Sequence, residues 1–490
     1  MRRIHRLIVQ LLCLGVAFIQ AGSALAADTP TALPTRPNIV VILTDDLSWN
    51  LVPYMPNVLK MQADGATFTR YFVTDSLCCP SRATILTGKF PHNTGVFTNT
   101  GDDGGFDIFE RNGNEQQTFG EVLKNSGYAT ALMGKYLNGY QTARDDVRPG
   151  WTEWDVASDG YSGFNYVLNQ NGALVAYGSK PEDYLTDVLL QRGIRFITES
   201  VNEGKPFILV VSTFAPHKPF TPAPRHAHLF PDIQQPRTPD FTAPPTRRAP
   251  HWLIQKVAQS PISARDIVRF DEMFRLRAQS VQAIDEMIDA LKVLLRQNGL
   301  ERNTYFLFTS DNGLHLGEHS LHRGKLTAFD HDIRVPLIVN GPGVPAGSVI
   351  DKVTENIDLY ATFLHLAGVQ EDPNTDGRSL VPLFLGKNRS NWRDYALIEH
   401  HGPVTDPLDP DYPESGGNPT QYVALRAAEE LYVEYEDGEV EYYDLTTDPF
   451  ELDSTASLLT PEKRMSLRAT LKALRNCVGA TKCWSRARAN

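Results

Sequence analysis

Four continuous apolar runs, each ending abruptly in polar residues, constrain the fold most strongly. They are rich in β-branched and aromatic residues, which is typical of strands buried on both faces. Between them lie segments whose apolar residues recur every three or four positions, most clearly at 269–297, and these predict helices. Strands that alternate with helices predict an α/β fold with a large, mostly parallel sheet flanked by helices. The runs are Asn38–Leu43, Ala129–Met133, Phe207–Phe214 and Thr304–Ser310.

Polar side chains follow each run, at the predicted carboxyl ends of the strands. Ligands of parallel sheets bind at this edge, so we expect these side chains to share one site. Their three carboxylates and one amide suit a hard divalent cation, Ca²⁺ or Mg²⁺, better than zinc. The residues are Asp45 and Asp46 after the first run, Lys135 after the second, His217 after the third, and Asp311 and Asn312 after the fourth.

Positive charges are expected around this cation. Arg82, Lys135 and Lys325, acting with a divalent metal, would bind an oxyanion ester and neutralise the charge that develops during its transfer. His217 follows a strand and is therefore a candidate general acid or base. Taken singly, either lysine is more often a solvated surface charge, and the Asp45–Asp46 pair is explained as well by a helix cap or turn.

The first 26 residues have the features of a secretory signal peptide: a basic start, an apolar run at Leu7–Ala21 and a cleavage site at Ala24–Ala26. We therefore expect a secreted or periplasmic protein, and no later segment has the length needed to span a bilayer. Loss of the three arginines in this segment changes the net charge from −11 to −14. An acidic chain without basic tracts argues against nucleic acid and anionic membranes as partners, so any anion must be recognised locally.

The cysteines divide into two groups. In an oxidising compartment, Cys477 and Cys483 are expected to close a small disulfide loop, and Cys13 leaves with the signal peptide. Cys78 and Cys79 then have no distant partners. Adjacent cysteines form a poor disulfide and lack the usual spacing of a metal-binding pair. One of them is therefore free for chemistry.

The pattern of apolar and polar residues changes after residue 375. We expect a catalytic domain at 27–375 and a C-terminal subdomain at 376–490. Short alternating runs around an Asp437–Gly438 hairpin turn predict a small antiparallel sheet in this subdomain, and residues 461–476 predict a closing helix. The proline-rich segment 220–260 predicts an irregular surface loop long enough to cover the mouth of the site.

The segment CCPSRATILTG at Cys78–Gly88 resembles the sulfatase signature C-x-P-S-R-x-x-x-[LI]-T-G. It is accompanied by the Asp45–Asp46 pair and by the motifs GKYLN, APHKPF, TSDNGLHLGEHSL and RGKLTAFDHDIRVPLIVNGPG. The likeness covers essentially the whole mature chain. Within the sulfatases it is most similar to the N-acetylglucosamine-6-sulfatase group, which shares the doubled cysteine and GKYLN. The resemblance implies an alkaline-phosphatase-like sandwich fold.

The resemblance also implies a cofactor chemistry. In sulfatases, a maturation enzyme oxidises the first cysteine of the signature, here Cys78, to Cα-formylglycine. One hydroxyl of the hydrated aldehyde attacks the ester sulfur, and the second loses its proton so that sulfate is expelled. The implied residue roles are Ca²⁺ ligation by Asp45, Asp46, Cys78, Asp311 and Asn312, binding of formylglycine and sulfate oxygens by Arg82 and Lys135, and contact with the leaving oxygen by His217 and Lys325.

One departure from the family concerns the base for sulfate elimination. Many sulfatases have a histidine two residues after the lysine matched by Lys135, whereas this chain has Leu137, as the N-acetylglucosamine-6-sulfatase group does. His92 and His315 are the alternative candidates for this base. Further histidines, at positions 226, 228, 400 and 401, lie in predicted loops whose relation to the site the sequence leaves open.

The implied substrate is a 6-O-sulfated N-acetylglucosamine unit of a glycosaminoglycan or similar glycan, with aryl sulfates as an alternative. A phosphoester or phosphonate hydrolase of the same superfamily is a rival interpretation, but it would usually bind two transition-type metals through extra histidines. A non-catalytic protein that binds sulfated glycans is a second rival. It would be expected to lose Cys78, Arg82 or a metal ligand, and all are present.

Overall fold

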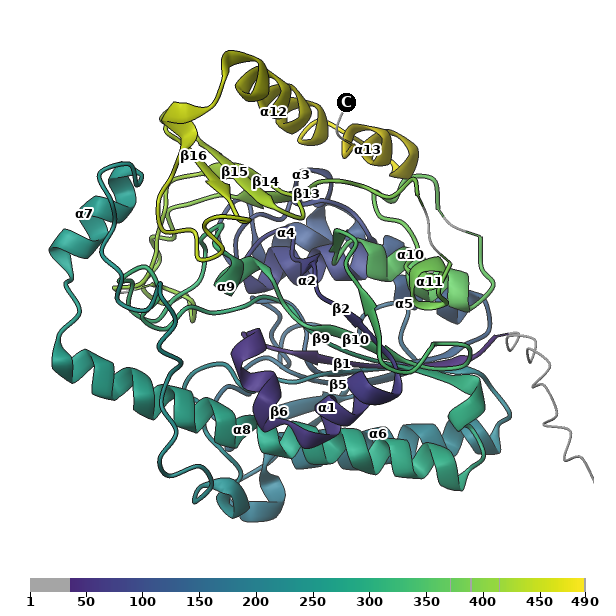
Figure 1. Cartoon of the computed structure of the whole chain (residues 1–490). Coiled ribbons are helices and arrows are strands. Elements are labelled where there is room, and N and C mark those ends of the chain that lie inside the picture. The colour runs from purple at the N-terminus through teal and green to yellow at the C-terminus, as the bar shows by residue number, and fades with distance from the viewer. Residues whose placement is uncertain (1–35, 371, 388–389, 414, 489–490) are drawn as a thin grey trace, which may run out of the picture. The chain divides into compact units, whose positions relative to one another are not determined.

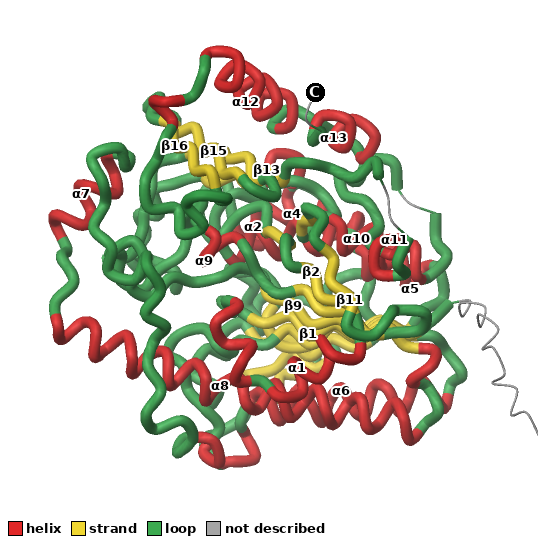
Figure 2. Tube along the Cα trace, viewed as in Figure 1, coloured by secondary structure: helices red, strands yellow, loops and turns green. Residues whose placement is uncertain are grey.

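A mixed sheet of ten strands lies at the centre of the protein, as the computed structural model shows (Figures 1 and 2). Five neighbouring strands, β9-β1-β8-β4-β5, run parallel, and the pairings beyond them include antiparallel ones on both sides. The predicted parallel sheet is thus confirmed for its centre. In spatial order the strands are β11 (Ser348–Ile350), β2 (Ala66–Phe68), β10 (Leu337–Asn340), β9 (Thr304–Ser310), β1 (Asn38–Thr44), β8 (Phe207–Ser212), β4 (Ala129–Lys135), β5 (Glu153–Ala157), β6 (Val167–Gln170) and β7 (Ala173–Ala176).

The structure describes residues 36–370, 372–387, 390–413 and 415–488. The predicted signal peptide at 1–26 lies outside these ranges. These described residues all lie within one compact unit. Among the described residues, no helix combines the length and the apolar character needed to cross a membrane.

Helices cover both faces of the sheet, because alternate residues of each central strand point to opposite sides. Ile39, Val41 and Leu43 of β1 belong to one core, whereas Val40 and Ile42 belong to the other. The first core includes α2 (Cys78–Thr87), α5 (Phe119–Asn125) and α10 (Asp358–Leu366), and the second includes α1 (Pro56–Asp64), α6 (Leu185–Asn202) and α8 (Ala264–Gln297). Shorter helices and strands are α3 (Pro91–Thr94), α4 (Gly105–Arg111), α9 (Asp330–Ile333), α11 (Val381–Phe384), β3 (Tyr71–Phe72) and β12 (Thr354–Glu355).

The predicted helix at 269–297 is confirmed within α8, which begins five residues earlier, at Ala264. Ser263 starts it with a capping box: its side chain accepts a hydrogen bond from Asp266 N, and the Asp266 side chain accepts one from Ser263 N. This pair satisfies backbone donors that would otherwise be unpaired at the start of the helix.

Strand register brings the four polar strand ends together. Leu43 of β1 is paired with Ser212 of β8, and Thr44 with Ser310 of β9. Gly134 of β4 is paired with the same Ser212. The residues that follow these positions therefore emerge side by side at one edge of the sheet.

The C-terminal region forms a four-stranded antiparallel sheet, as predicted, made of β13 (Ala396–His400), β14 (Tyr422–Arg426), β15 (Glu430–Tyr435) and β16 (Val440–Asp444). Gly438 in the β15–β16 turn has a φ of 92°, which glycine adopts readily. The closing helix is α12 (Pro461–Leu474), and a second helix, α13 (Ala480–Arg486), follows it. A disulfide joins Cys477, which follows α12, to Cys483 within α13. The boundary at residues 375 and 376 stays a prediction.

The segment 220–260 is irregular over most of its length, as predicted, but it ends in the helix α7 (His251–Gln259). Pro250 at its N-cap and the following run without proline allow this helix to form. The irregular part contacts the loop that follows β9, since Phe241 forms a bridge with Glu318.

Candidate active site

The structure brings the predicted site residues together in one buried cluster. Asp45 and Asp46 follow β1, Asp311 and Asn312 follow β9, Lys135 ends β4, His217 follows β8 and Cys78 begins α2. Lys325 comes from the loop between β9 and α9. Each of these residues is at most 3% exposed, and so is Arg82. Strand ends that are far apart in the sequence thus enclose a polar site shielded from water.

Helix α2 presents Cys78 and Arg82 to this cluster. Pro80 is tolerated in its first turn because the N–H that proline lacks would have no partner inside the helix there. Gly88 ends the helix in a left-handed conformation with a φ of 67°, and its N–H donates to Thr84 O at 2.8 Å. Cys78 and Arg82 are four residues apart, and this spacing places both side chains on one face of the helix.

Asp45 contacts both the cysteine and a lysine. Its Oδ1 accepts from Cys78 Sγ at 3.1 Å, and its Oδ2 accepts from Lys135 Nζ at 2.7 Å. Lys325 Nζ lies 3.0 Å from the same sulfur atom. The side chain at position 78 is therefore held between a carboxylate and an ammonium group.

Asp46 and Asn312 form the part of the cluster best suited to a cation. Asp46 Oδ1 accepts from Asn312 Nδ2 and from Lys325 Nζ, both at 2.7 Å. By contrast, Asp46 Oδ2 and Asn312 Oδ1 are buried and have no hydrogen-bond partner. Buried oxygen atoms usually find a donor or a metal, so these two fit ligands of a hard cation. Asp46 adopts a φ of 64°, a left-handed conformation that aspartate tolerates better than most residues.

Among the described residues, candidate metal ligands from His, Cys, Asp and Glu converge at one place. One ligand atom each from Asp45, Asp46, Cys78 and His217 lies within 4.8 Å of the others. The oxygen-rich donor set, extended by Asp311 and Asn312, favours Ca²⁺ or Mg²⁺. It fits the cation expected from the sequence.

The guanidinium group of Arg82 is anchored by three partners: its Nη1 donates to Lys135 O at 3.3 Å, and two further contacts are shorter. Its Nε donates to Asp311 Oδ2 at 2.8 Å, and its Nη1 donates to Ser212 Oγ at 2.6 Å. Its Nη2 is buried, has no hydrogen-bond partner and lies 3.8 Å from Asp45 Oδ1. An arginine held in this way keeps one donor group available for an anionic ligand.

Burial and neighbouring charges shift the pKa values in this cluster in different directions. Burial alone would raise the pKa of Asp45, but Lys135, followed by His217 and Arg82, holds it well below its usual range. Burial raises the pKa of Asp311 to about 6, because Arg82 only partly offsets it. Burial raises the pKa of the Cys78 thiol well above its ordinary value, and the carboxylates add to the effect. An unmodified Cys78 is therefore a weak nucleophile, since the thiolate is the reactive form.

Three residues near the cluster were not predicted from the sequence. Asp411 is buried and contacts both His217 Nε2, at 2.9 Å, and Lys325 Nζ, at 2.8 Å. The ring of Tyr161 lies 5.0 Å from Lys135 Nζ and 4.6 Å from the His217 ring. Ser212 binds Arg82 as described above. Ser212 lies within the predicted run Phe207–Phe214, where it is the first polar residue, and could have been found in that way. Asp411 and Tyr161 lie in segments without a periodic signal.

The candidate replacements for the missing histidine differ in their surroundings. Leu137 itself is buried in the hydrophobic core. Both ring nitrogens of His92 are engaged, with Glu399 at 2.7 Å and with Cys477 O at 2.9 Å. His315 Nδ1 bonds Asp332 at 2.9 Å, and its backbone pairs with Gly324, the neighbour of Lys325. His315 also follows Asn312 by three residues in the sequence, so it is the candidate that lies nearer to a residue of the cluster along the chain.

The remaining loop histidines have partners outside the cluster or face solvent. His226 bonds Glu286 at 2.8 Å. His400 does not lie in a loop, as the sequence predicted, but ends β13, because it pairs with Tyr422 of β14; it is buried, with its ring 5.1 Å from that of Tyr422. His401 stacks on Phe97 at 3.6 Å between ring centres. His228 is exposed.

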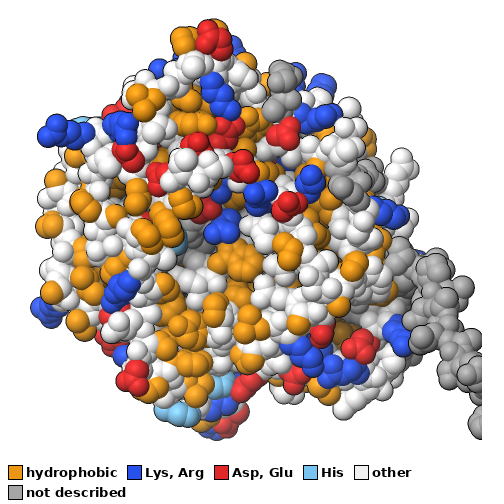
Figure 3. Space-filling model, in the orientation of Figure 1, with side chains coloured by type: hydrophobic (Ala, Val, Ile, Leu, Met, Phe, Trp, Pro, Cys, Tyr) orange, Lys and Arg blue, Asp and Glu red, His pale blue; other side chains and the backbone are white. Residues whose placement is uncertain are grey.

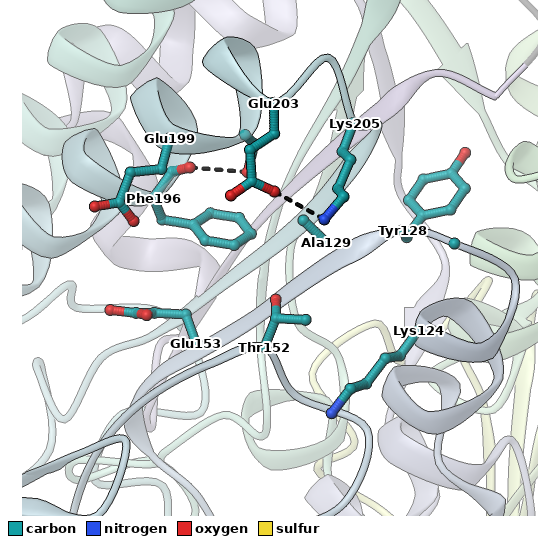
Figure 4. Close-up of a pocket in the computed structure, with 11 residues that line it drawn as sticks. Lys124, Tyr128, Ala129, Thr152, Glu153, Phe196, Glu199, Glu203 and Lys205 are labelled. Carbon is teal, nitrogen blue, oxygen red and sulfur yellow. Dashed lines mark hydrogen bonds and ion pairs between the residues drawn. The ribbon is translucent and has the colours of Figure 1, made fainter.

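Away from the cluster, the protein has a mixed surface on one face and a cavity at the amino ends of two strands. On the face shown in Figure 3, acidic, basic and apolar side chains are interspersed. A cavity of about 390 Å³ lies where β4 and β5 begin (Figure 4). Lys205 pairs there with Glu203 at 2.8 Å, and Lys124 donates to Trp151 O at 3.0 Å. Because it lies at the amino ends of the strands, we assign this cavity no part in the chemistry of the cluster.

Comparison with known sequences gives matches over most of the chain. A sequence model described as Sulfatase matches residues 37–369, and one described as N-sulphoglucosamine sulphohydrolase, C-terminal, matches residues 317–476. The chain is 35% identical over 500 residues to an N-acetylglucosamine-6-sulfatase from Capra hircus, with 96% of this chain and 87% of the goat protein covered.

Two solved structures share the fold at lower sequence identity. The first is the structure of a protein in complex with its substrate D-glucosamine-2-N,6-O-disulfate. It has a TM-score of 0.74 and 24% sequence identity to this chain, and the match covers 89% of this chain and 97% of that chain. The second is a phosphonate monoester hydrolase of Agrobacterium radiobacter, with a TM-score of 0.66, 22% identity and coverage of 89% and 96%. The alkaline-phosphatase-like fold predicted from the sequence is confirmed.

Proposed function

The chain belongs to the sulfatase family of sulfuric ester hydrolases, and from this premise we propose that it removes the 6-O-sulfate of N-acetylglucosamine units in a glycosaminoglycan or related glycan. The observation that carries the proposal is the position of residue 78. Its side chain lies between Asp45 and Lys325, beside buried oxygen atoms without hydrogen-bond partners. This arrangement suits a nucleophile next to a divalent cation.

The cofactors are a formylglycine made from Cys78 by a maturation enzyme and a bound Ca²⁺, for which Mg²⁺ is the alternative. When present, the hydrated aldehyde supplies the attacking oxygen and the means to expel sulfate afterwards, while the cation withdraws charge from the ester oxygens. The residues that would hold the cation are Asp45, Asp46, residue 78, Asp311 and Asn312.

The side chains around residue 78 are suited to bind the sulfate group. Lys135 Nζ and the free Nη2 of Arg82 both face Asp45, the first at 2.7 Å and the second at 3.8 Å. These two cationic groups would bind sulfate oxygens and stabilise the negative charge that they gain in the transition state. Because the site is buried, these charges act with little screening by water.

His217 and Lys325 would interact with the oxygen of the leaving alcohol. His217 Nδ1 faces the carbonyl oxygen of Lys218 at 2.9 Å, and its Nε2 faces a carboxylate. Both neighbours are acceptors, so both ring nitrogens carry hydrogen and Nε2 is a donor. Lys325 Nζ adds a second donor beside residue 78.

The proposed substrate is supported by the 35% identity to a curated N-acetylglucosamine-6-sulfatase over 96% of the chain. Fold likeness alone is weaker support, since a phosphonate monoester hydrolase has the same fold. The single convergence of metal-ligand atoms among the described residues favours one cation rather than two. Aryl sulfates are an alternative class of substrate.

We further propose that the protein is exported. The basic, apolar and A-x-A features of residues 1–26 support this, and so does the Cys477–Cys483 disulfide, because disulfides persist in oxidising compartments. The C-terminal subdomain at 376–490 would contribute part of the binding surface for the glycan.

The test combines mass spectrometry with activity measurements. Protein made with a formylglycine-generating enzyme should carry residue 78 in a peptide about 18 Da lighter than the cysteine form, a covalent modification of that side chain. It should release sulfate from N-acetylglucosamine 6-sulfate. The Cys78→Ala variant should lose both properties, whereas Cys79→Ala, its matched neighbour, should keep both.

Two results would contradict the proposal. Full activity of a preparation that contains only unmodified Cys78 would exclude the formylglycine mechanism. If protein with converted residue 78 hydrolysed phosphonate or phosphate esters in clear preference to sulfate esters, the result would favour a phosphoester or phosphonate hydrolase of the same superfamily.

A further inference from the structure

Asp411 reaches the active site from the C-terminal region. It lies in the loop between β13 and β14. Strand β13 runs beside the segment that leads into α2, where Glu399 N donates to Thr74 O at 2.7 Å. The loop after β13 therefore starts next to the elements that present Cys78.

One oxygen of Asp411 joins the two donors assigned to the leaving group. Its Oδ1 lies 2.9 Å from His217 Nε2 and 2.8 Å from Lys325 Nζ. The side chain is about 1% exposed, so these charge-assisted contacts form away from water. His217 follows β8 and Lys325 lies in the loop between β9 and α9, and this carboxylate links them directly.

The other oxygen of Asp411 is anchored to the helix that presents the nucleophile. Asn99 Nδ2 donates to Asp411 Oδ2 at 2.8 Å, and Asn99 Oδ1 accepts from Cys79 N at 2.9 Å. Asp411 N also donates to Asp409 Oδ1 at 2.8 Å. Asp411 is therefore fixed in position by contacts at both carboxylate oxygens and at its backbone N–H. These contacts argue against the alternative that Asp411 only occupies the site until substrate displaces it.

We propose, on the basis of the function proposed above, that Asp411 is a positioning residue for the leaving group. It orients Lys325 Nζ, which lies 3.0 Å from the side chain of residue 78, so that this group donates to the alcohol oxygen. It also keeps the His217 ring beside that oxygen, where Nε2–H is shared between Asp411 and the substrate. As the sulfur–oxygen bond breaks, its electron pair stays on this oxygen, the SO₃ group passes to the nucleophile at residue 78, and a proton from one of the two donors completes the alcohol. Asp411 itself exchanges no proton with the substrate.

This role depends on how poor the leaving group is. A sugar alkoxide is strongly basic and needs donors at its oxygen, whereas 4-nitrophenolate leaves with little assistance. Asp411 should therefore matter for alkyl sulfates such as sugar 6-sulfates and matter little for 4-nitrophenyl sulfate. A residue that only stabilised the fold would affect both substrates equally.

The experiment compares Asp411→Asn with the wild type on N-acetylglucosamine 6-sulfate and 4-nitrophenyl sulfate, with the formylglycine content of each preparation measured. The matched control is Asp406→Asn, the same substitution at an exposed position of the same loop. Asp411→Asn should lower kcat/KM for the sugar sulfate about 10²-fold, as loss of a transition-state donor does. It should lower kcat/KM for the aryl sulfate by less than about fivefold. Asp406→Asn should match the wild type on both.

Asn99→Ala is a second variant, which keeps the carboxylate but removes its anchor. It should shift the ratio of sugar to aryl activity in the same direction by a smaller factor. Equal losses on both substrates in both variants would overturn the proposal and indicate a structural role. Unchanged or increased activity of Asp411→Asn on the sugar sulfate would also overturn it and indicate a displaceable carboxylate. Wild-type protein with converted residue 78 that hydrolyses neither ester would overturn the proposed function as well.

Discussion

Calcium binding should stabilise this protein against heat by an amount that follows from two buried oxygen atoms. Asp46 Oδ2 and Asn312 Oδ1 have no hydrogen-bond partner. Leaving a buried polar atom unpaired costs about 1–3 kcal/mol, so a cation that contacts both would relieve about 2–6 kcal/mol. This range is the expected difference in the free energy of unfolding between the cation-bound and cation-free protein.

The stabilisation converts into a shift in Tm. Unfolding entropy is about 2.1 cal/mol/K per residue, which gives about 1 kcal/mol/K for a unit of this size and hence a Tm rise of about 2–6 °C. The assay is thermal unfolding followed by circular dichroism, with chelator-treated protein titrated with CaCl₂. Because stabilisation follows RT ln(1 + [L]/Kd), it should reach about 2.7 kcal/mol at a hundredfold excess over Kd and rise logarithmically beyond.

Asp46→Asn is the informative variant. Asparagine tolerates the left-handed backbone of residue 46, where φ is 64°, so the substitution removes one carboxylate oxygen without straining the chain. The calcium-dependent shift should fall sharply in this variant and persist in Asp159→Asn, the same change at an exposed position. A wild-type Tm that calcium does not change, or an equal shift in Asp46→Asn, would refute the assignment of these oxygens as cation ligands.

Two further predictions concern pH and the anchored arginine. Burial raises the pKa of Glu441 from 4.5 to about 7, so the folded state keeps a proton that the unfolded state loses. The stability contribution of Glu441 is therefore highest below pH 4.5 and should fall by about 3 kcal/mol as the pH rises to about 7. Urea unfolding at pH 5 and pH 8 should show that Glu441→Gln lacks this fall, and the exposed Glu436→Gln should behave like the wild type. Arg82→Lys should lower kcat/KM about 10²-fold per formylglycine-containing molecule, because one ammonium group cannot reproduce the donors that now bind Asp311 and Ser212. Activity within a few-fold of wild type would show that a point charge suffices there.

Much of the fold was predictable because the sequence patterns that indicate its strands and turns lie within short segments of the chain. In the run Asn38–Leu43, residues 39–43 are all apolar, which is typical of a strand buried on both faces, and β1 is found there. The Asp437–Gly438 turn identified a hairpin of the C-terminal sheet. The helix α7 was not predicted, because the prolines of 220–260 dominate the composition of a segment whose last nine residues before Ser260 contain none.

The sequence by itself determined the chemical groups of the active site. Strand ends at Asp45, Lys135 and Asp311, together with the signature at Cys78, predict oxygen ligands, cationic groups and a cysteine that a maturation enzyme modifies. The parallel sheet then requires that they meet, because the carboxyl ends of parallel strands lie at one edge. The register of Thr44 with Ser310 agrees with this expectation.

Only the tertiary structure decided which residue contacts His217 and Lys325, the proposed leaving-group donors. Asp411 lies 194 residues from His217 in the sequence, in a loop without periodic pattern, and reaches the site because β13 lies against the segment before α2. Composition and spacing report on contacts within a helix or strand, whereas a contact of this kind depends on how two sheets pack against each other. The chain therefore encodes the proposed nucleophile and cation ligands in local motifs, and the position of Asp411 only in the assembled fold.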